Sequence, residues 1–188
     1  MSRARAEATI DDLYKVEGKA EIVNGELVLM SPTGSSSGRA GGVIYRSLLE
    51  YEEETGRGFA YPDNVGFVVE LPTRKSFSPD AAFYVGEPGG ATFLKGAPLL
   101  AAEVRSEEDY GAAAEKRLAA KRADYFAAGT QVVWDVDVIR EGWVRSHSAE
   151  RPDEPRVCHR GDTADAEPVL PGWCLPVDDI LRGSRRRG

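Results

Sequence analysis

Cysteine, histidine and long apolar runs are scarce in this sequence, and each shortage excludes a class of protein. Two cysteines, Cys158 and Cys174, are too few for a disulfide framework and lack the spacing of a zinc site. Two free thiols fit a reducing compartment, so we expect a cytoplasmic protein. No stretch approaches the roughly 20 apolar residues of a membrane-spanning helix. Residues 1–18 lack the apolar segment of a signal peptide, and we expect no membrane partner.

Basic residues are also fewer than acidic ones. The chain has 24 Lys and Arg against 31 Asp and Glu, a net charge of −7. Proteins that coat nucleic acid by neutralising phosphates have the opposite balance. A nuclease stays possible, because acids that bind a metal ion add local negative charge. The basic end, Arg182 with residues 185–187, would either contact phosphate or form a solvated tail.

The composition is that of an ordinary globular protein. Hydrophobic residues make up 41% and charged residues 29% of the 188-residue chain. A chain of this length can bury a core of its own, so we expect one domain over residues 1–188. His147 and His159 have no metal-ligand spacing, and Trp134, Trp143 and Trp173 are expected to pack in the core.

Local patterns predict a mixture of helices and strands. Thr9 and Asp12 form a capping-box pattern at the start of a first helix. The pair Asn24-Gly25 between two apolar runs predicts a β-hairpin. After a loop at 31–38, longer helices are expected at 39–54 and, with Ser106 as N-cap, at 107–127. Further strands are expected at 65–71, 80–85, 98–104, 131–136, 142–146 and 157–159, with a closing helix at 176–181.

This order predicts the fold class. The strand at 98–104 is largely apolar, which is typical of a central strand that is covered on both faces. Helices alternate with groups of strands along the chain. We therefore expect an α/β fold with a mixed central sheet flanked by helices, preceded by an N-terminal helix and β-hairpin.

Two acidic residues lie in strands where an isolated carboxylate is costly. Asp80 opens one strand, and Glu103 follows five apolar residues in the next. If the strands are neighbours, both acids face one cleft. Side chains alternate along a strand, so Arg105 shares the face of Glu103. For either acid in isolation, a strand-end or ion-paired carboxylate is the simpler interpretation.

A lysine on the following helix strengthens this prediction. At about 100° per residue, Ala114, Leu118, Lys121 and Tyr125 form one stripe, whereas Lys116 lies on the other side. A lysine on the inward face needs a negative partner. Metal-binding carboxylates or a substrate phosphate would be that partner. The alternatives are a snorkelling lysine or a pair with a structural acid.

Two short motifs resemble a known superfamily. Ser78-Pro79-Asp80 and Glu103-Val104-Arg105 resemble the signature of the PD-(D/E)XK nucleases, with Arg105 where the signature lysine would be. The chain is similar in particular to the Uma-two-type branch, described as candidate restriction endonucleases. The motifs shared with that branch are Glu21-Ile-Val-Asn-Gly-Glu-Leu, Ser31-Pro32, Ala97-Pro-Leu-Leu-Ala-Ala-Glu103-Val104, Lys121-Arg-Ala-Asp-Tyr125, Ala128-Gly129 and Val133-Trp134-Asp135-Val136-Asp137.

The resemblance covers roughly residues 10–147 and leaves 148–188 as a C-terminal extension. The chain departs from the branch at two positions. Ser37 stands near the position where the branch often has a histidine, and Arg105 replaces a smaller residue after Glu-Val.

The resemblance implies a restriction-endonuclease-like fold and Mg²⁺- or Mn²⁺-dependent hydrolysis of DNA phosphodiester bonds. Asp80 and Glu103 would bind the metal. Lys121, moved from the strand to the helix, would orient water or stabilise charge on phosphorus. Glu21 would be an accessory acid, and Arg105 would hold a substrate phosphate.

Other functions remain open at this point. A catalytically inactive homodimer on the same fold would bind DNA or a protein without cleavage. A pure protein-interaction domain would bind neither metal nor nucleic acid. We expect a homodimer for the nuclease as well, because cutting two strands favours two-fold symmetry.

Overall fold

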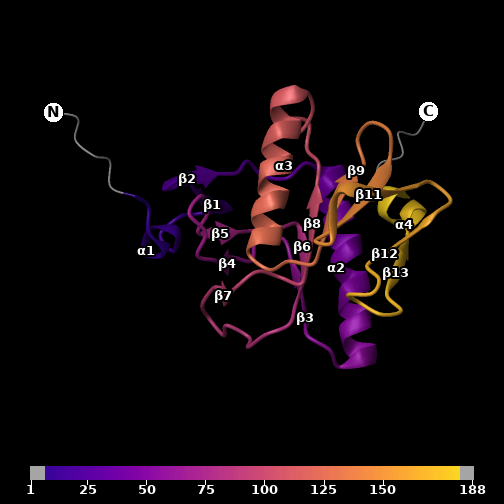
Figure 1. Ribbon diagram of the computed structural model, residues 1–188, viewed down its shortest axis with the longest axis horizontal. Helices are drawn as coiled ribbons and strands as arrows, with labels where there is room; N and C mark the ends of the chain where they lie inside the picture. Colours follow the sequence, from indigo (N-terminus) through magenta and orange to yellow (C-terminus); the bar gives the residue numbers. More distant parts are fainter. Residues whose placement is uncertain (1–6, 183–188) are drawn as a thin grey trace.

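A six-stranded mixed sheet forms the centre of the protein, as seen in a computed structural model that describes residues 7–182 (Figure 1). The strand order is β11-β10-β9-β8-β6-β3. The strands are β3 (Phe59–Pro62), β6 (Ala81–Tyr84), β8 (Leu100–Val104), β9 (Val132–Asp137), β10 (Trp143–Ser148) and β11 (Arg151–His159). The mixed sheet confirms the predicted fold class. Residues 185–187, for which phosphate contact and a solvated tail are both considered above, lie outside the described residues.

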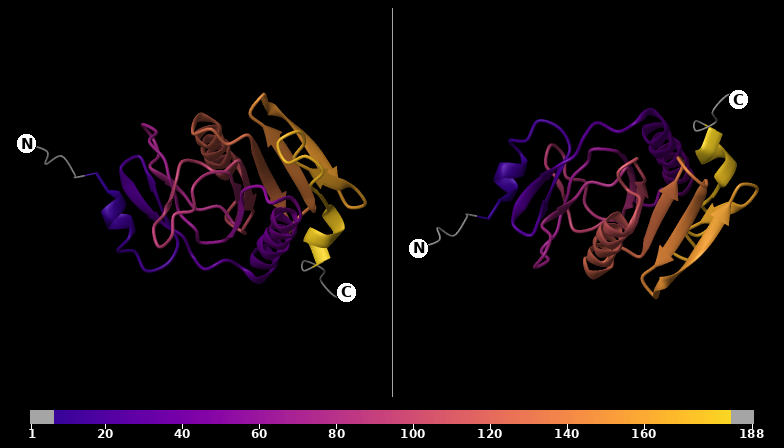
Figure 2. Two further views of the ribbon diagram at one scale, coloured as in Figure 1. Left: turned by 90° about the horizontal axis from the view of Figure 1, so that it is seen from below. Right: turned by 90° about the horizontal axis from the view of Figure 1, so that it is seen from above.

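The strands β8 and β9 form the parallel pair of this sheet, and their neighbours are antiparallel. A parallel pair needs a long crossover connection. Helix α3 (Ala112–Ala127) supplies that crossover, and it covers one face of the sheet. Helix α2 (Ser35–Thr55) covers the other face, with α4 (Val177–Leu181) beside it (Figure 2).

Successive side chains of each strand point to opposite faces of the sheet, so the core has two layers. On the α2 face, Ala102, Trp134 and Val144 pack with helix residues such as Ile44 and Leu48. On the α3 face, Ala101 and Val133 pack with Tyr125. These four positions of β8 and β9 are all buried, which explains why the predicted strand at 98–104 is so apolar.

The segment after residue 148 is part of the same core. Strands β12 (Thr163–Asp165) and β13 (Cys174–Pro176) form a hairpin that leads into α4. Trp173 packs on Trp134 with ring centroids 4.8 Å apart. Its Nε1 donates to Ser47 Oγ on α2 over 3.1 Å. The three tryptophans are buried, as predicted.

The N-terminal part forms a smaller layer beside the main sheet. Helix α1 (Ile10–Leu13) begins with the predicted capping box, and β1 (Ala20–Val23) pairs with β2 (Glu26–Leu29). Asn24 and Gly25 have φ of 49° and 75°, the left-handed values of a tight hairpin turn. A three-stranded sheet of β4 (Phe67–Val68), β5 (Ser76–Phe77) and β7 (Leu94–Lys95) lies next to this hairpin.

Two predicted helix starts were wrong. Helix α2 begins at Ser35 instead of residue 39, because Ser37 Oγ donates to the Arg105 carbonyl over 2.8 Å and holds the first turn against the sheet. Helix α3 begins at Ala112 instead of residue 107. Residues 106–109 form a separate turn, in which the backbone N–H and hydroxyl of Ser106 donate to Asp109, and Gly111 has a non-helical φ of 93°.

The strand prediction at 65–71 was too long. Only Phe67–Val68 of that segment pairs, and β3 and β12 were not predicted at all. No helix of the described part is long and apolar enough to cross a membrane.

Candidate active site

Two strand ends bring the predicted acids to one place. Asp80 precedes β6, and its backbone N–H donates to the Ala102 carbonyl of β8 over 3.0 Å. The side chain turns back to β8 as well, because Asp80 Oδ2 accepts from the Val104 N–H over 2.7 Å. Glu103 lies between these two residues. The neighbouring strands therefore hold Asp80 and Glu103 side by side.

Glu103 is bound by two residues of helix α3. Lys121 Nζ donates to Glu103 Oε2 over 2.8 Å, and the Tyr125 hydroxyl donates to Oε1 over 2.6 Å. Lys121 and Tyr125 are one helical turn apart, so a single face of α3 supplies both donors. The structure thus places Lys121 on the inward face and leaves Lys116 exposed.

Glu21 joins this group from strand β1. Lys121 Nζ lies 2.9 Å from Glu21 Oε1, so one ammonium bridges two carboxylates. Glu21 also accepts from the Ser78 N–H and pairs with Arg74. Its side chain is only 4% exposed, which means that Glu21 is an internal anchor for Lys121 and not an acid at the site edge.

A second lysine binds Asp80. Lys19 Nζ lies 2.8 Å from Asp80 Oδ1 and 2.6 Å from Asp63 Oδ1. Lys19 comes from the residue before β1, and Asp63 follows β3. The Lys19 side chain is 13% exposed, so the ammonium sits largely inside the protein. Each site carboxylate is therefore paired with a cation of the same chain.

These pairs set the proton affinities of the site. Burial raises the pKa of Glu103, and the negative charges of Asp80 and Glu21 raise it further. Lys121 acts in the opposite direction, but the pKa of Glu103 remains raised. Burial would also raise the pKa of Glu21, but Lys121 and Arg74 outweigh it and hold that pKa below its usual value. Burial opposes the charge of Lys121, yet Glu103 and Glu21 raise its pKa. Lys121 thus stays protonated.

Arg105 lies on the same side of the sheet but is not part of this group. Its guanidinium binds both oxygens of Asp135, each over 2.7 Å, and pairs with Glu115. It also packs over the ring of Trp143 at 4.9 Å. The side chain is 3% exposed. These contacts give Arg105 a structural role, and the geometry does not support the predicted phosphate contact.

The site fits a hard divalent cation through its donor set. Such cations prefer carboxylate oxygens, and Mg²⁺ typically uses one or two carboxylates together with waters. Asp80 and Glu103 supply two, and each of their oxygens still has acceptor capacity after its present hydrogen bond. Within residues 7–182 no group of three or more His, Cys, Asp or Glu side chains is arranged to hold a metal ion.

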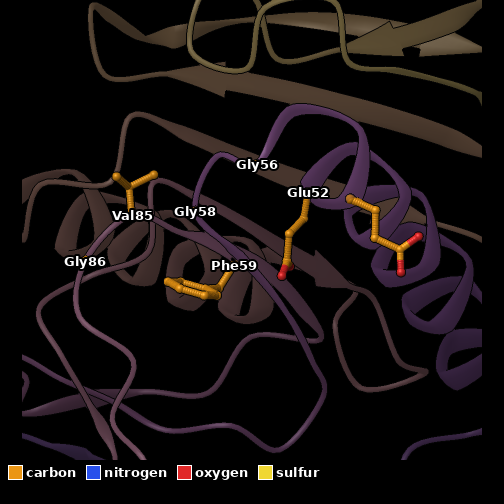
Figure 3. Close-up of a pocket in the computed structure, with 7 residues that line it drawn as sticks. Glu52, Gly56, Gly58, Phe59, Val85 and Gly86 are labelled. Carbon is orange, nitrogen blue, oxygen red and sulfur yellow. The ribbon is translucent and has the colours of Figure 1, made fainter.

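Another hollow lies between the end of α2 and the β3 edge of the sheet (Figure 3). Glu52, Glu53, Phe59 and Val85 line it together with glycines. Glu52 Oε2 already accepts from the Ala60 N–H over 2.6 Å. The residues that line this hollow include no basic side chain to contact a phosphate, so we do not assign the nuclease site here.

Sequence reasoning missed Lys19, Asp63, Arg74 and Tyr125 at this site. Tyr125 had a detectable signal, because it lies on the same helical stripe as Lys121. The other three come from loops, where no periodic pattern indicates which way a side chain points. His147 is buried within the sheet and His159 is exposed, and neither contacts the site group.

Comparisons with known proteins identify a family and a similar fold. A family model described as Uma2, putative restriction endonuclease, matches residues 9–178. The crystal structure of a putative nuclease belonging to DUF820 from Anabaena variabilis ATCC 29413 is similar, with a TM-score of 0.73 and 14% sequence identity over 95% of this chain and 99% of that chain. At this identity the likeness shows a shared nuclease-like fold. No curated protein matches the chain.

Proposed function

The chain belongs to the Uma2 family of putative restriction endonucleases, and from this premise we propose that it is a divalent-metal-dependent DNA endonuclease. The observation that carries the proposal is the bridge of Lys121 between Glu103 and Glu21, with Asp80 on the adjacent strand. Two carboxylates that can bind a metal ion and one protonated lysine are groups suited to metal-assisted phosphodiester hydrolysis.

Asp80 and Glu103 would hold Mg²⁺ or Mn²⁺. When bound, such an ion supplies a water nucleophile at neutral pH and neutralises charge on the phosphate. Lys121 would donate an N–H to a phosphate oxygen or to the attacking water. Tyr125 and Glu21 act through others: the tyrosine hydroxyl orients Glu103, and Glu21 holds the lysine in place.

A homodimer completes the proposal. A duplex has two strands of opposite direction, and two copies related by a two-fold axis present one site to each strand. Sedimentation of the protein alone and with duplex DNA measures this directly. A monomer in both conditions would contradict the dimer without affecting the metal site.

One observation favours a second candidate function. Every site carboxylate already has a cationic partner in the chain, and Arg105 replaces the signature lysine. An inactive homodimeric module that binds DNA or a protein would keep this fold and these pairs. It would show no metal-dependent cleavage.

The deciding experiment combines Mn²⁺ calorimetry with cleavage assays on linear, supercoiled, single-stranded and branched DNA. We expect binding to the wild-type protein and metal-dependent cleavage of at least one DNA form. Asp80→Asn should abolish both, because the amide lacks the negative charge. Asp153→Asn, at an exposed position of β11, serves as the matched control. Metal binding that survives Asp80→Asn would refute the assignment.

A further inference from the structure

Lys19 is the cation nearest to the proposed metal ligand Asp80, and the family motifs do not account for it. Its Nζ bridges Asp80 Oδ1 at 2.8 Å and Asp63 Oδ1 at 2.6 Å. Burying a lysine is costly unless it is paired. With 13% of its side chain exposed, Lys19 makes two ion pairs where Lys15, 73% exposed, makes one local pair with Asp12.

The Lys19 ammonium lies at the Asp80 oxygen that does not bind the Val104 N–H of β8. Asp80 Oδ2 accepts from that N–H, which leaves it one lone pair. The other oxygen, Oδ1, is the one that Lys19 occupies. A divalent cation that approaches Asp80 through Oδ1 therefore meets a positive charge.

Lys19 also has a second ion-pair partner, Asp63. Asp63 is 39% exposed and also accepts from the Asn64 N–H over 2.7 Å, so its carboxylate is held at the rim of the site. An ammonium that leaves Asp80 can keep its bond to Asp63. Departure from Asp80 then costs one ion pair and not two.

We propose that Lys19 is an internal counter-ion that occupies the metal position of Asp80 in the metal-free protein and is displaced when a divalent cation binds. This rests on the proposed function, in that it takes Asp80 as a metal ligand. Competition of this kind lowers the affinity for metal, because the lysine charge repels the ion and must be moved. It also keeps Asp80 compensated while no metal is bound.

Calorimetry with Mn²⁺ on Lys19→Met tests the proposal, with Lys15→Met as the matched control. Removing a unit positive charge a few ångströms from the metal should tighten binding on the order of ten- to a hundredfold. Lys15→Met should bind like the wild type, because Lys15 pairs only with Asp12. Lys19→Gln, which keeps a donor for Asp63 without the charge, replaces Lys19→Met if that variant does not fold, and the same tightening is expected.

Thermal unfolding in a chelator gives a second readout that does not depend on cleavage. Without Lys19 the Asp80 carboxylate is uncompensated, so the melting temperature should fall by several degrees and recover when Mn²⁺ is added. Wild-type binding at Asp80 with equal or weaker binding in both Lys19 variants would overturn the role of Lys19 alone. Absence of Mn²⁺ binding in every variant would overturn the proposed function together with it.

Discussion

At the scale of single residues, Lys121 has a structural role in addition to the proposed catalytic one. It bridges Glu103 and Glu21, whose side chains are 19% and 4% exposed. Removing one partner of a buried ion pair leaves the other charges uncompensated, which typically costs about 3–5 kcal/mol. The same ammonium is the donor proposed for the phosphate. Its loss should therefore affect folding and chemistry together.

We predict that Lys121→Met lowers the free energy of unfolding by about 3 kcal/mol and the cleavage rate by about 10² to 10³. Urea denaturation measures the first effect, and cleavage assayed below the melting temperature measures the second. Lys116→Met, on the exposed side of the same helix, should match the wild type in both. Equal losses in the two variants would contradict the assignment of Lys121 to the site.

His147 gives the protein a pH dependence of its own. Burial lowers the pKa of His147, and the positive charge of Arg122 lowers it further. The hydrogen bond to the Pro152 carbonyl acts in the opposite direction, but the pKa of His147 remains lowered. Its Nε2 has no hydrogen-bond partner within residues 7–182. The folded protein therefore binds a proton here less readily than the unfolded chain, and stability is lost as the pH falls below about 6.5, the ordinary value for histidine.

We expect His147→Gln to flatten the dependence of unfolding free energy on pH below about 6.5, where the histidine of the unfolded chain takes up a proton. Chemical denaturation at several pH values measures this slope. The exposed His159→Gln is the control and should keep the wild-type slope. An unchanged slope in His147→Gln would mean that another group causes the loss.

At the scale of elements, helix α2 approaches Asp80 so closely that a side chain at Gly41 would be a tight fit. A Cβ atom at Gly41 would lie 3.2 Å from the Asp80 carbonyl oxygen and 3.4 Å from the Asp80 Cβ. A Cβ at the next residue, Gly42, meets nothing within 4 Å. The two glycines thus differ only in the face of the helix they occupy.

We predict different outcomes for alanine at these two positions. Gly42→Ala should raise the stability by up to about 1 kcal/mol, because alanine favours the helix. Gly41→Ala should gain less and weaken Mn²⁺ binding severalfold, because it pushes on Asp80. Thermal unfolding and calorimetry measure the pair. Equal stabilisation with unchanged metal affinity would show that the contact has no influence on the site.

Regular periodicity explains which parts of the site were predictable. Asp80 opens an apolar strand, Glu103 lies within another, and Lys121 shares a helical stripe with Tyr125. The period of each element therefore indicates which way these side chains point. Lys19 and Asp63 lie 44 residues apart in loops beside different strands. Their meeting depends on how the hairpin β1–β2 docks against the sheet. Arg105 was assigned to the correct face, but its acidic partners Asp135 and Glu115 come from other elements.

The predicted helix boundaries were wrong where a tertiary contact competes with a local sequence signal. The Ser-Gly segment before α2 has the composition of a loop, yet Ser37 binds the Arg105 carbonyl and the helix extends through it. Ser106 has the composition of an N-cap, yet its partner Asp109 closes an isolated turn. A sequence pattern alone does not distinguish these cases, because the deciding bond or dihedral is set by the folded chain.

At the scale of the whole molecule, residues 158–181 complete the core. Trp173 packs on Trp134, and α4 contacts α2. The buried residues of this segment include Cys158, Ala164, Ala166, Leu170, Leu175, Val177, Ile180 and Leu181. The family match likewise runs to residue 178, beyond the 10–147 region of the sequence resemblance.

A chain that ends at residue 147 should therefore fail to fold cooperatively. Its α2 face would expose Trp134, Val144 and the helix residues that Trp173 covers. Near-ultraviolet circular dichroism and thermal unfolding of the truncated chain measure this outcome. In the full chain, Trp173→Ala should cost about 3–5 kcal/mol. A truncated chain with a sharp melting transition would show that the first 147 residues are a complete folding unit.

The pairing of the site acids with Lys19, Lys121 and Arg74 separates assembly from activation. Zinc fingers and similar small domains need their metal in order to fold, so a chelator denatures them. Here the chain supplies its own positive charges to the site acids, so we expect it to fold without a metal ion. Under the proposed function, removing the metal would abolish cleavage without unfolding the protein. Returning the metal would restore cleavage without a refolding step.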